Sequence, residues 1–112
     1  MAYDEKLAER VRGALAGRPG LSERKMFGGL AFMLGGHMAC GVVKDELMLR
    51  VGPERYEKAL ALAHVRAMDF TGRPMKGMVY VGTAGLGTDA DLRGWVERAA
   101  AYAGSLPPKP AR

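Results

Sequence analysis

The sequence predicts a single α+β domain, in which helices cover one face of an antiparallel sheet. Apolar residues recur about every four positions near both ends of the chain and every second position in its middle. Glycine and proline separate these stretches at short intervals. The chain has 112 residues, the length of one domain. We expect this domain to span residues 1–104, followed by a mobile tail at residues 105–112, which contain three prolines.

The first expected element is a helix over residues 3–16. Leu7, Val11 and Leu15 recur at a spacing of four and form one apolar stripe, while charged residues occupy the other sides. Gly17, followed shortly by a Pro-Gly pair, ends this helix.

Three strands are expected next, over residues 30–34, 38–42 and 47–51, because apolar residues alternate there with other residues. A glycine pair at 35–36 suits a tight turn that needs positive φ, and the polar residues 44–46 suit a second turn. Strands joined by such short turns form an antiparallel meander.

The second half of the chain is expected to hold a helix, two strands and a last helix. Pro53 suits the first position of the second helix, where its missing N–H costs nothing. Strands are expected near residues 66–70 and over 78–81, followed by a glycine-rich loop at 82–87. Thr88 has the side chain of an N-cap residue and opens the final helix.

The two faces of the expected sheet differ in their side chains. The larger ones, which suit the helix-covered face, are Leu30, Phe32, Leu34, Leu47 and Leu49. The opposite face is also apolar, although a solvated face is normally polar. We therefore expect a second copy of the chain, in a homodimer, or another protein to cover it, with the chain's own loops and tail as the alternative. The candidate interface residues are Met33, Ala39, Val43, Met48, Val79 and Val81.

The net charge of +5 suits acidic partners, including nucleic acid, but does not require them. Basic residues precede the first expected strand at Arg24 and Lys25, lie in the third at Arg50, and follow the fourth at Arg73 and Lys76. Brought together, they would contact phosphates. Charges near loops are usually only solvated, so direct nucleic-acid binding is an alternative that we do not favour.

We recognise no catalytic, metal-binding or cofactor-binding pattern, and we expect a non-enzymatic protein without metal or cofactor. An enzyme of unrecognised type is the least favoured alternative. Cys40 lies within an expected strand, where a buried, inert thiol is the usual case. His37 is three residues away, which places the two on opposite faces of a strand. The loop at 82–87 precedes a helix, but the aspartates that open this helix would repel a phosphate.

We expect the protein to lie in the cytoplasm, without membrane contact. The chain has no apolar run near the ~20 residues that a membrane span needs. Its acidic and polar start is unlike a secretory signal, and its lone cysteine cannot form an internal disulfide.

Two segments together resemble a known family. Residues 24–30 read Arg-Lys-Met-Phe-Gly-Gly-Leu, and residues 68–77 read Met-Asp-Phe-Thr-Gly-Arg-Pro-Met-Lys-Gly. With Leu49-Arg50-Val51-Gly52 and the closing Asp91-Leu92-x-x-Trp95-Val96, they resemble the N-terminal domain of the TfoX/Sxy family, over about residues 3–103.

This resemblance implies a two-layer α-β(3)-α-β(2)-α fold with the topology of secretion chaperones. Full-length members are bacterial regulators of natural competence, thought to promote transcription together with the cyclic-AMP receptor protein, without established enzymatic activity. They add a C-terminal helical domain, so this chain is expected to be a stand-alone regulatory or protein-interaction module with a link to transcription. The matched positions that we take as the candidate interaction surface are Arg24, Lys25, Arg50, Asp69, Arg73 and Lys76.

Overall fold

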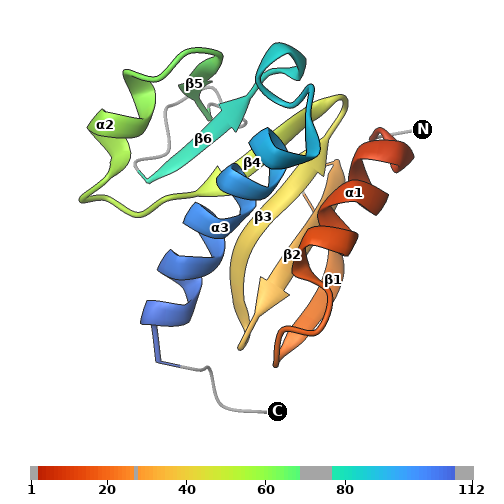
Figure 1. Cartoon of the computed structure of the whole chain (residues 1–112). Helices are drawn as coiled ribbons and strands as arrows, with labels where there is room; N and C mark the ends of the chain where they lie inside the picture. Colours follow the sequence, from red (N-terminus) through yellow and green to blue (C-terminus); the bar gives the residue numbers. More distant parts are fainter. Residues whose placement is uncertain (1–2, 27, 69–76, 108–112) are drawn as a thin grey trace.

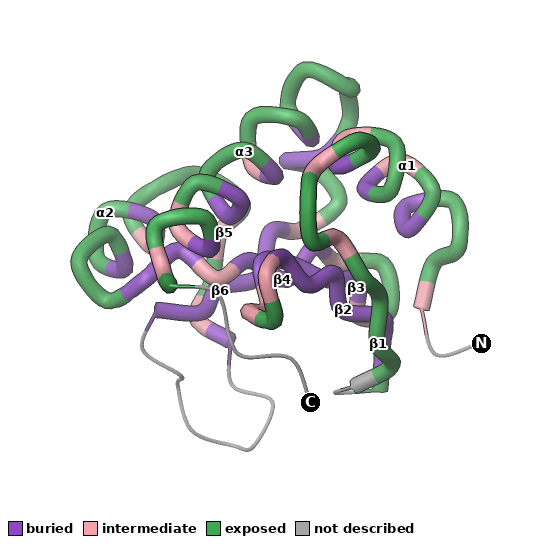
Figure 2. Tube along the Cα trace, turned by 90° about the horizontal axis from the view of Figure 1, so that it is seen from below, coloured by how far each residue is buried: buried purple, intermediate pink, exposed green. Residues whose placement is uncertain are grey.

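The computed structural model describes residues 3–26, 28–68 and 77–107. Its elements, in chain order, are α1 (Glu5–Leu15), β1 (Leu21–Met26), β2 (Gly29–Leu34), β3 (His37–Val43), β4 (Glu46–Arg50), α2 (Tyr56–Leu60), β5 (Val65–Ala67), β6 (Met78–Val81), the 3-10 turn η1 (Thr83–Gly85) and α3 (Asp89–Ser105). The three α-helices lie on the same side of the sheet (Figures 1 and 2). The predicted two-layer α+β class is confirmed.

The described strands form one antiparallel sheet in the order β1-β2-β3-β4-β6-β5. The first of them, β1, was not expected, so Arg24 and Lys25 lie within a strand and not before one. This strand reads Leu-Ser-Glu-Arg-Lys-Met and has little apolar alternation, because it lies at the edge of the sheet. Charged side chains are typical of edge strands, where they discourage pairing with other chains.

Both long helices begin at side-chain caps. The Asp4 carboxylate accepts hydrogen bonds from the backbone N–H groups of Lys6 and Leu7, at 2.9 and 3.2 Å. The Thr88 hydroxyl accepts from the backbone N–H of Asp91 at 3.0 Å, as the sequence predicts. The second helix, in contrast, begins at Tyr56 and not at Pro53, which lies in the preceding turn.

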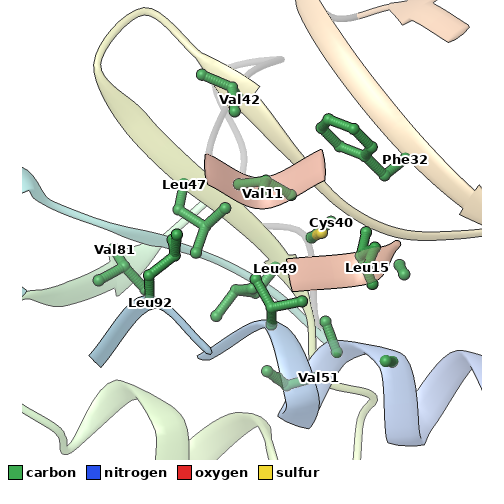
Figure 3. Packing of buried hydrophobic residues seen from close by; sticks show 14 of the residues in the cluster. Val11, Leu15, Phe32, Cys40, Val42, Leu47, Leu49, Val51, Val81 and Leu92 are labelled. Atoms are coloured by element: carbon green, nitrogen blue, oxygen red, sulfur yellow. The ribbon is translucent and has the colours of Figure 1, made fainter. Parts of the chain in front are cut away.

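The main hydrophobic core lies between the sheet and the helices (Figure 3). Phe32 and Leu49 from the strands, Leu15 from α1 and Val96 from α3 are fully buried there. The alternating apolar residues of the strands and the apolar residues spaced by four in α1 therefore pack into one shared core.

A second cluster lies on the opposite side of the sheet, which we call the methionine face. It contains Ala31, Met33, Met48, Met68, Met78 and Tyr80, with Met38 and Val43 packed at its margin. Met48 is fully buried, and Tyr80 is only 5% exposed within the single chain. The six clustered side chains are therefore largely shielded from water within the single chain, whereas Met38 and Val43 at the margin are partly exposed. The homodimer expected from the sequence stays a prediction.

Three residues assigned to that face from the sequence lie instead in the helix-side core, namely Ala39, Val79 and Val81. For the first, the reason is a β-bulge. Phe32 faces Cys40 and Met33 faces Met38, which leaves Ala39 as an extra residue in β3 and breaks the alternation.

The two valines of β6 were assigned to the wrong face because the partner of this strand was unknown. Val79 lies opposite Leu49 and Val81 opposite Leu47, and both leucines point toward the helices. Directly opposite residues in a sheet share a face. Met33, Val43 and Met48 do lie on the methionine face, as expected.

Candidate interaction site

The residues of the predicted interaction surface do not meet at one place. Arg24 lies opposite Ala31 on the methionine face, whereas Lys25 lies opposite Leu30 on the helix side. Arg50 lies three strands away in β4, or about 14 Å at the usual strand spacing. Asp69, Arg73 and Lys76 lie outside the described residues. Among the described positions, the structure therefore brings no two of these cations into one patch.

Three hollows surround the connection between β4 and α2, residues 51–55. The first has a volume of about 320 Å³ and lies beside Arg50, Met78 and Tyr102. The second, of about 470 Å³, separates the connection from the end of α3 at Tyr102 and Ser105. The third, of about 410 Å³, is lined by residues of α2 and α3. A further hollow, of about 300 Å³, lies away from this connection, between the turn after α1 and the end of α3.

Gly52 positions the connection against α3. Its φ of +87° is one that side-chain-bearing residues rarely adopt, and a Cβ atom here would lie 2.4 Å from the Tyr102 ring. The N–H groups of Val51 and Gly52 both donate to the carbonyl of Gly77, at 2.8 and 3.2 Å. The start of the connection is therefore fixed by backbone hydrogen bonds and by close packing on an aromatic ring.

We call the third hollow the α2–α3 groove; its lining residues are Val51, Arg55, Lys58, Ala59, Leu62 and Arg98. Spacings of three and four place Arg55, Lys58 and Leu62 along one side of α2 and the turn that follows it. Among the described residues, Leu62 is the large hydrophobic side chain that stays exposed, at 37%. The groove therefore combines an apolar surface with cations at its rim.

Arg98 lines the groove from α3 and contacts the ring of Trp95. Its guanidinium lies 5.0 Å from the centroid of the Trp95 ring, within the range of a cation–π contact. The indole N–H of Trp95 donates to the carbonyl of Gly85 at 3.0 Å. The hydrogen bond orients the ring, and the ring favours this position of the guanidinium.

The lining of the groove contains three cations and no carboxylate. The neighbouring carboxylate of Glu97 pairs with Arg18, on the other side of α3. Within the part of the chain that the structure describes, Arg55, Lys58 and Arg98 form no salt bridge. This site was not predicted from the sequence, although the spacing of Arg55, Lys58 and Leu62 was a signal for one half of it.

The residues considered for catalysis lie elsewhere. Cys40 is buried in the helix-side core, and this burial raises the pKa of its thiol to about 12. The Nε2 atom of His37 lies 2.5 Å from the carbonyl oxygen of Pro107. Over residues 3–26, 28–68 and 77–107, no three His, Cys, Asp or Glu side chains come close enough to hold a metal ion. None of the described helices has the length and apolar character of a membrane span.

The structure is thus a small α+β domain with an open groove whose lining is basic and partly apolar. A family model for the TfoX N-terminal domain matches residues 13–103, which include every residue of the groove. The chain therefore belongs to the TfoX N-terminal domain family, and the resemblance seen in the sequence is confirmed. No curated protein and no solved structure matches the chain significantly.

Proposed function

We propose that the chain is a non-enzymatic regulatory domain that acts by binding another protein and thereby affects transcription. Membership of the TfoX N-terminal domain family supports a regulatory role. The observation that carries the binding role is the α2–α3 groove, where the exposed Leu62 lies beside three cations without salt-bridge partners among the described residues. Exposed apolar side chains within a polar rim are the usual composition of a protein-binding surface.

A genetic experiment in the native host tests the regulatory role. The gene is deleted, and transcripts are compared between the deletion strain, the strain complemented with the natural chain, and one complemented with Arg55→Glu together with Lys58→Glu. We expect a defined set of transcripts to change on deletion and to return with the natural chain only. Unchanged transcripts, or full restoration by the charge-reversed chain at equal protein level, would contradict the proposal.

Nucleic-acid binding is the second candidate, favoured by the net charge of +5 and by the cations of the groove. Such binding is strongest at low salt, because it releases counterions from the phosphates. A mobility-shift assay with duplex DNA and with RNA at low ionic strength tests it. Binding there that weakens steeply with added salt would favour this candidate over a protein partner.

A further inference from the structure

We infer that the α2–α3 groove binds an acidic peptide segment of a partner protein, and that an aliphatic side chain of this segment packs against Leu62. This inference rests on the proposed function and names the class of partner. It concerns the hollow between α2 and α3 and none of the other hollows of the described chain.

The charges of the groove select a carboxylate. Two of its three cations, Arg55 and Arg98, carry planar guanidinium groups, which bind a carboxylate through two parallel hydrogen bonds. Arg98 is already held by its contact with Trp95, so less side-chain freedom is lost when it binds a partner. No lining carboxylate competes for these cations.

The apolar part of the groove selects an aliphatic side chain. Val51 and Ala59 are almost fully buried and form the floor, and Leu62 is exposed at the rim. A Leu or Ile side chain of the partner would complete the cover of these atoms and remove them from water. An acidic segment without such a side chain would leave Leu62 solvated.

The same composition favours a peptide over a nucleic acid. A phosphate backbone gains nothing from Leu62, and sequence-tolerant binding of single strands relies on free aromatic faces. Trp95 is only partly exposed, its ring is in contact with Arg98, and its N–H is used by Gly85. The described lining therefore offers cations and an aliphatic contact but no stacking surface.

A display library of random peptides, selected on the purified full-length chain, tests the inference. We expect the enriched peptides to combine several Asp or Glu residues with at least one Leu, Ile or Val. Against Arg55→Glu with Lys58→Glu, the affinity of these peptides should fall at least about tenfold, because two attractive charges become repulsive. Added NaCl should weaken binding to the natural chain.

A control variant carries the same change in charge outside the groove. Lys6 and Arg93 are exposed, take part in no salt bridge among the described residues, and do not line the groove. Lys6→Glu with Arg93→Glu should bind the enriched peptides within about twofold of the natural chain, since the distant charges are screened. Equal losses in both double variants would overturn the inference.

Two further variants keep the test decisive if the short helix α2 does not tolerate charge reversal. Arg98→Gln removes one cation from the long helix α3, and Leu62→Ser removes the apolar contact. Each should weaken peptide binding severalfold while circular dichroism stays unchanged. Enrichment of peptides without acidic residues would overturn the inference. It would also be overturned if no peptide were selected and the chain bound DNA, with this binding lost in Arg55→Glu with Lys58→Glu.

The outcome is separable from that of the proposed function. Selection of acidic, aliphatic peptides by a chain whose deletion changes no transcript would leave the groove assignment standing and remove the regulatory role. If deletion changes transcripts but no acidic peptide is selected, the regulatory role stands and the groove assignment is removed.

Discussion

The two flanks of α3 differ in how they use their charges (Figure 1). On one flank α1 packs against α3, the ion pair Arg10–Asp89 joins the two helices, and Arg18–Glu97 joins the turn after α1 to α3. On the other flank α2 packs against β5 and β6, and a groove separates it from α3. Three cations and an exposed leucine line this groove without a carboxylate. Charges on the α1 flank therefore pair with charges on α3, whereas the three cations of the groove form no salt bridge among the described residues.

The largest expected difference between the flanks is in access to solvent. Cys40 is buried in the helix-side core, near Leu15 of α1 (Figure 3), and its pKa of about 12 leaves on the order of one thiol in ten thousand ionised at pH 8. We expect a maleimide to leave Cys40 unmodified in the native chain and to modify it after unfolding in urea. Leu62→Cys, made in a Cys40→Ala background, should react at least about a thousandfold faster. Comparable rates at the two positions would contradict the contrast.

Two leucine truncations sharpen the same contrast in stability. Leu15→Ala removes a fully buried side chain and should lower the free energy of unfolding by about 3 kcal/mol. Leu62→Ala should change it by less than about 0.5 kcal/mol, because that side chain is exposed. Urea denaturation measures both values. A large loss at Leu62 would mean that the groove is part of the core.

Two glycine substitutions test whether the chain beside the groove is held in a special conformation. Gly52→Ala forces an L residue into positive φ against the Tyr102 ring and should cost about 2 kcal/mol. Gly94→Ala meets no atom within 4 Å in the middle of α3 and should stabilise the chain by about 0.5–1 kcal/mol. Thermal unfolding followed by circular dichroism measures the Tm of both variants. We expect Gly52→Ala to lower the Tm and Gly94→Ala to raise it, and equal changes in Tm would contradict the assigned geometry.

The smallest expected effect concerns an ion pair between α1 and β1. Arg12 donates to both carboxylate oxygens of Glu23, at 2.6 and 2.8 Å, and this hydrogen bonding lowers the pKa of Glu23. Because the pair is partly exposed, Glu23→Gln should cost only about 0.5 kcal/mol at neutral pH.

The pH dependence of that loss follows from the direction of the shift. The pKa of Glu23 is lower in the folded chain than in the unfolded chain, where it is about 4.3. The ion pair therefore stabilises the fold fully above that unfolded pKa. This contribution is lost as the pH falls through the folded-state pKa. The natural chain and Glu23→Gln should therefore converge in stability in acid. Glu57→Gln on the α2 flank is the control for loss of an exposed carboxylate. A gap between the natural chain and Glu23→Gln that persists below the folded value would contradict the assigned pair.

Local patterns predicted most of the architecture. The spacing of Leu7, Val11 and Leu15 fixed the buried side of α1, and Thr88 marked the start of α3. The edge strand β1 was missed because three of its six residues are charged, and the face of Ala39 was misassigned because a bulge changes the alternation of β3. These features depend on neighbouring strands, which a local pattern does not contain.

The groove was missed for a related reason. Arg55 and Lys58 are about forty residues from Arg98 along the chain, and only the packing of two helices on one sheet brings them together. Two cations that the sequence placed on one predicted surface are, in contrast, separated by the structure. Arg24 and Lys25 are neighbours in sequence but point to opposite sides of a strand. Sequence proximity therefore did not indicate which charges share a surface.

A nuclear magnetic resonance titration of the labelled chain with a selected acidic peptide tests the groove most directly. The predicted result is a contiguous set of amide shifts at residues 51–62 and around Arg98, with β1 and the methionine face unchanged. Shifts centred on β1 or on the α1 flank, with residues 51–62 unaffected, would contradict the account.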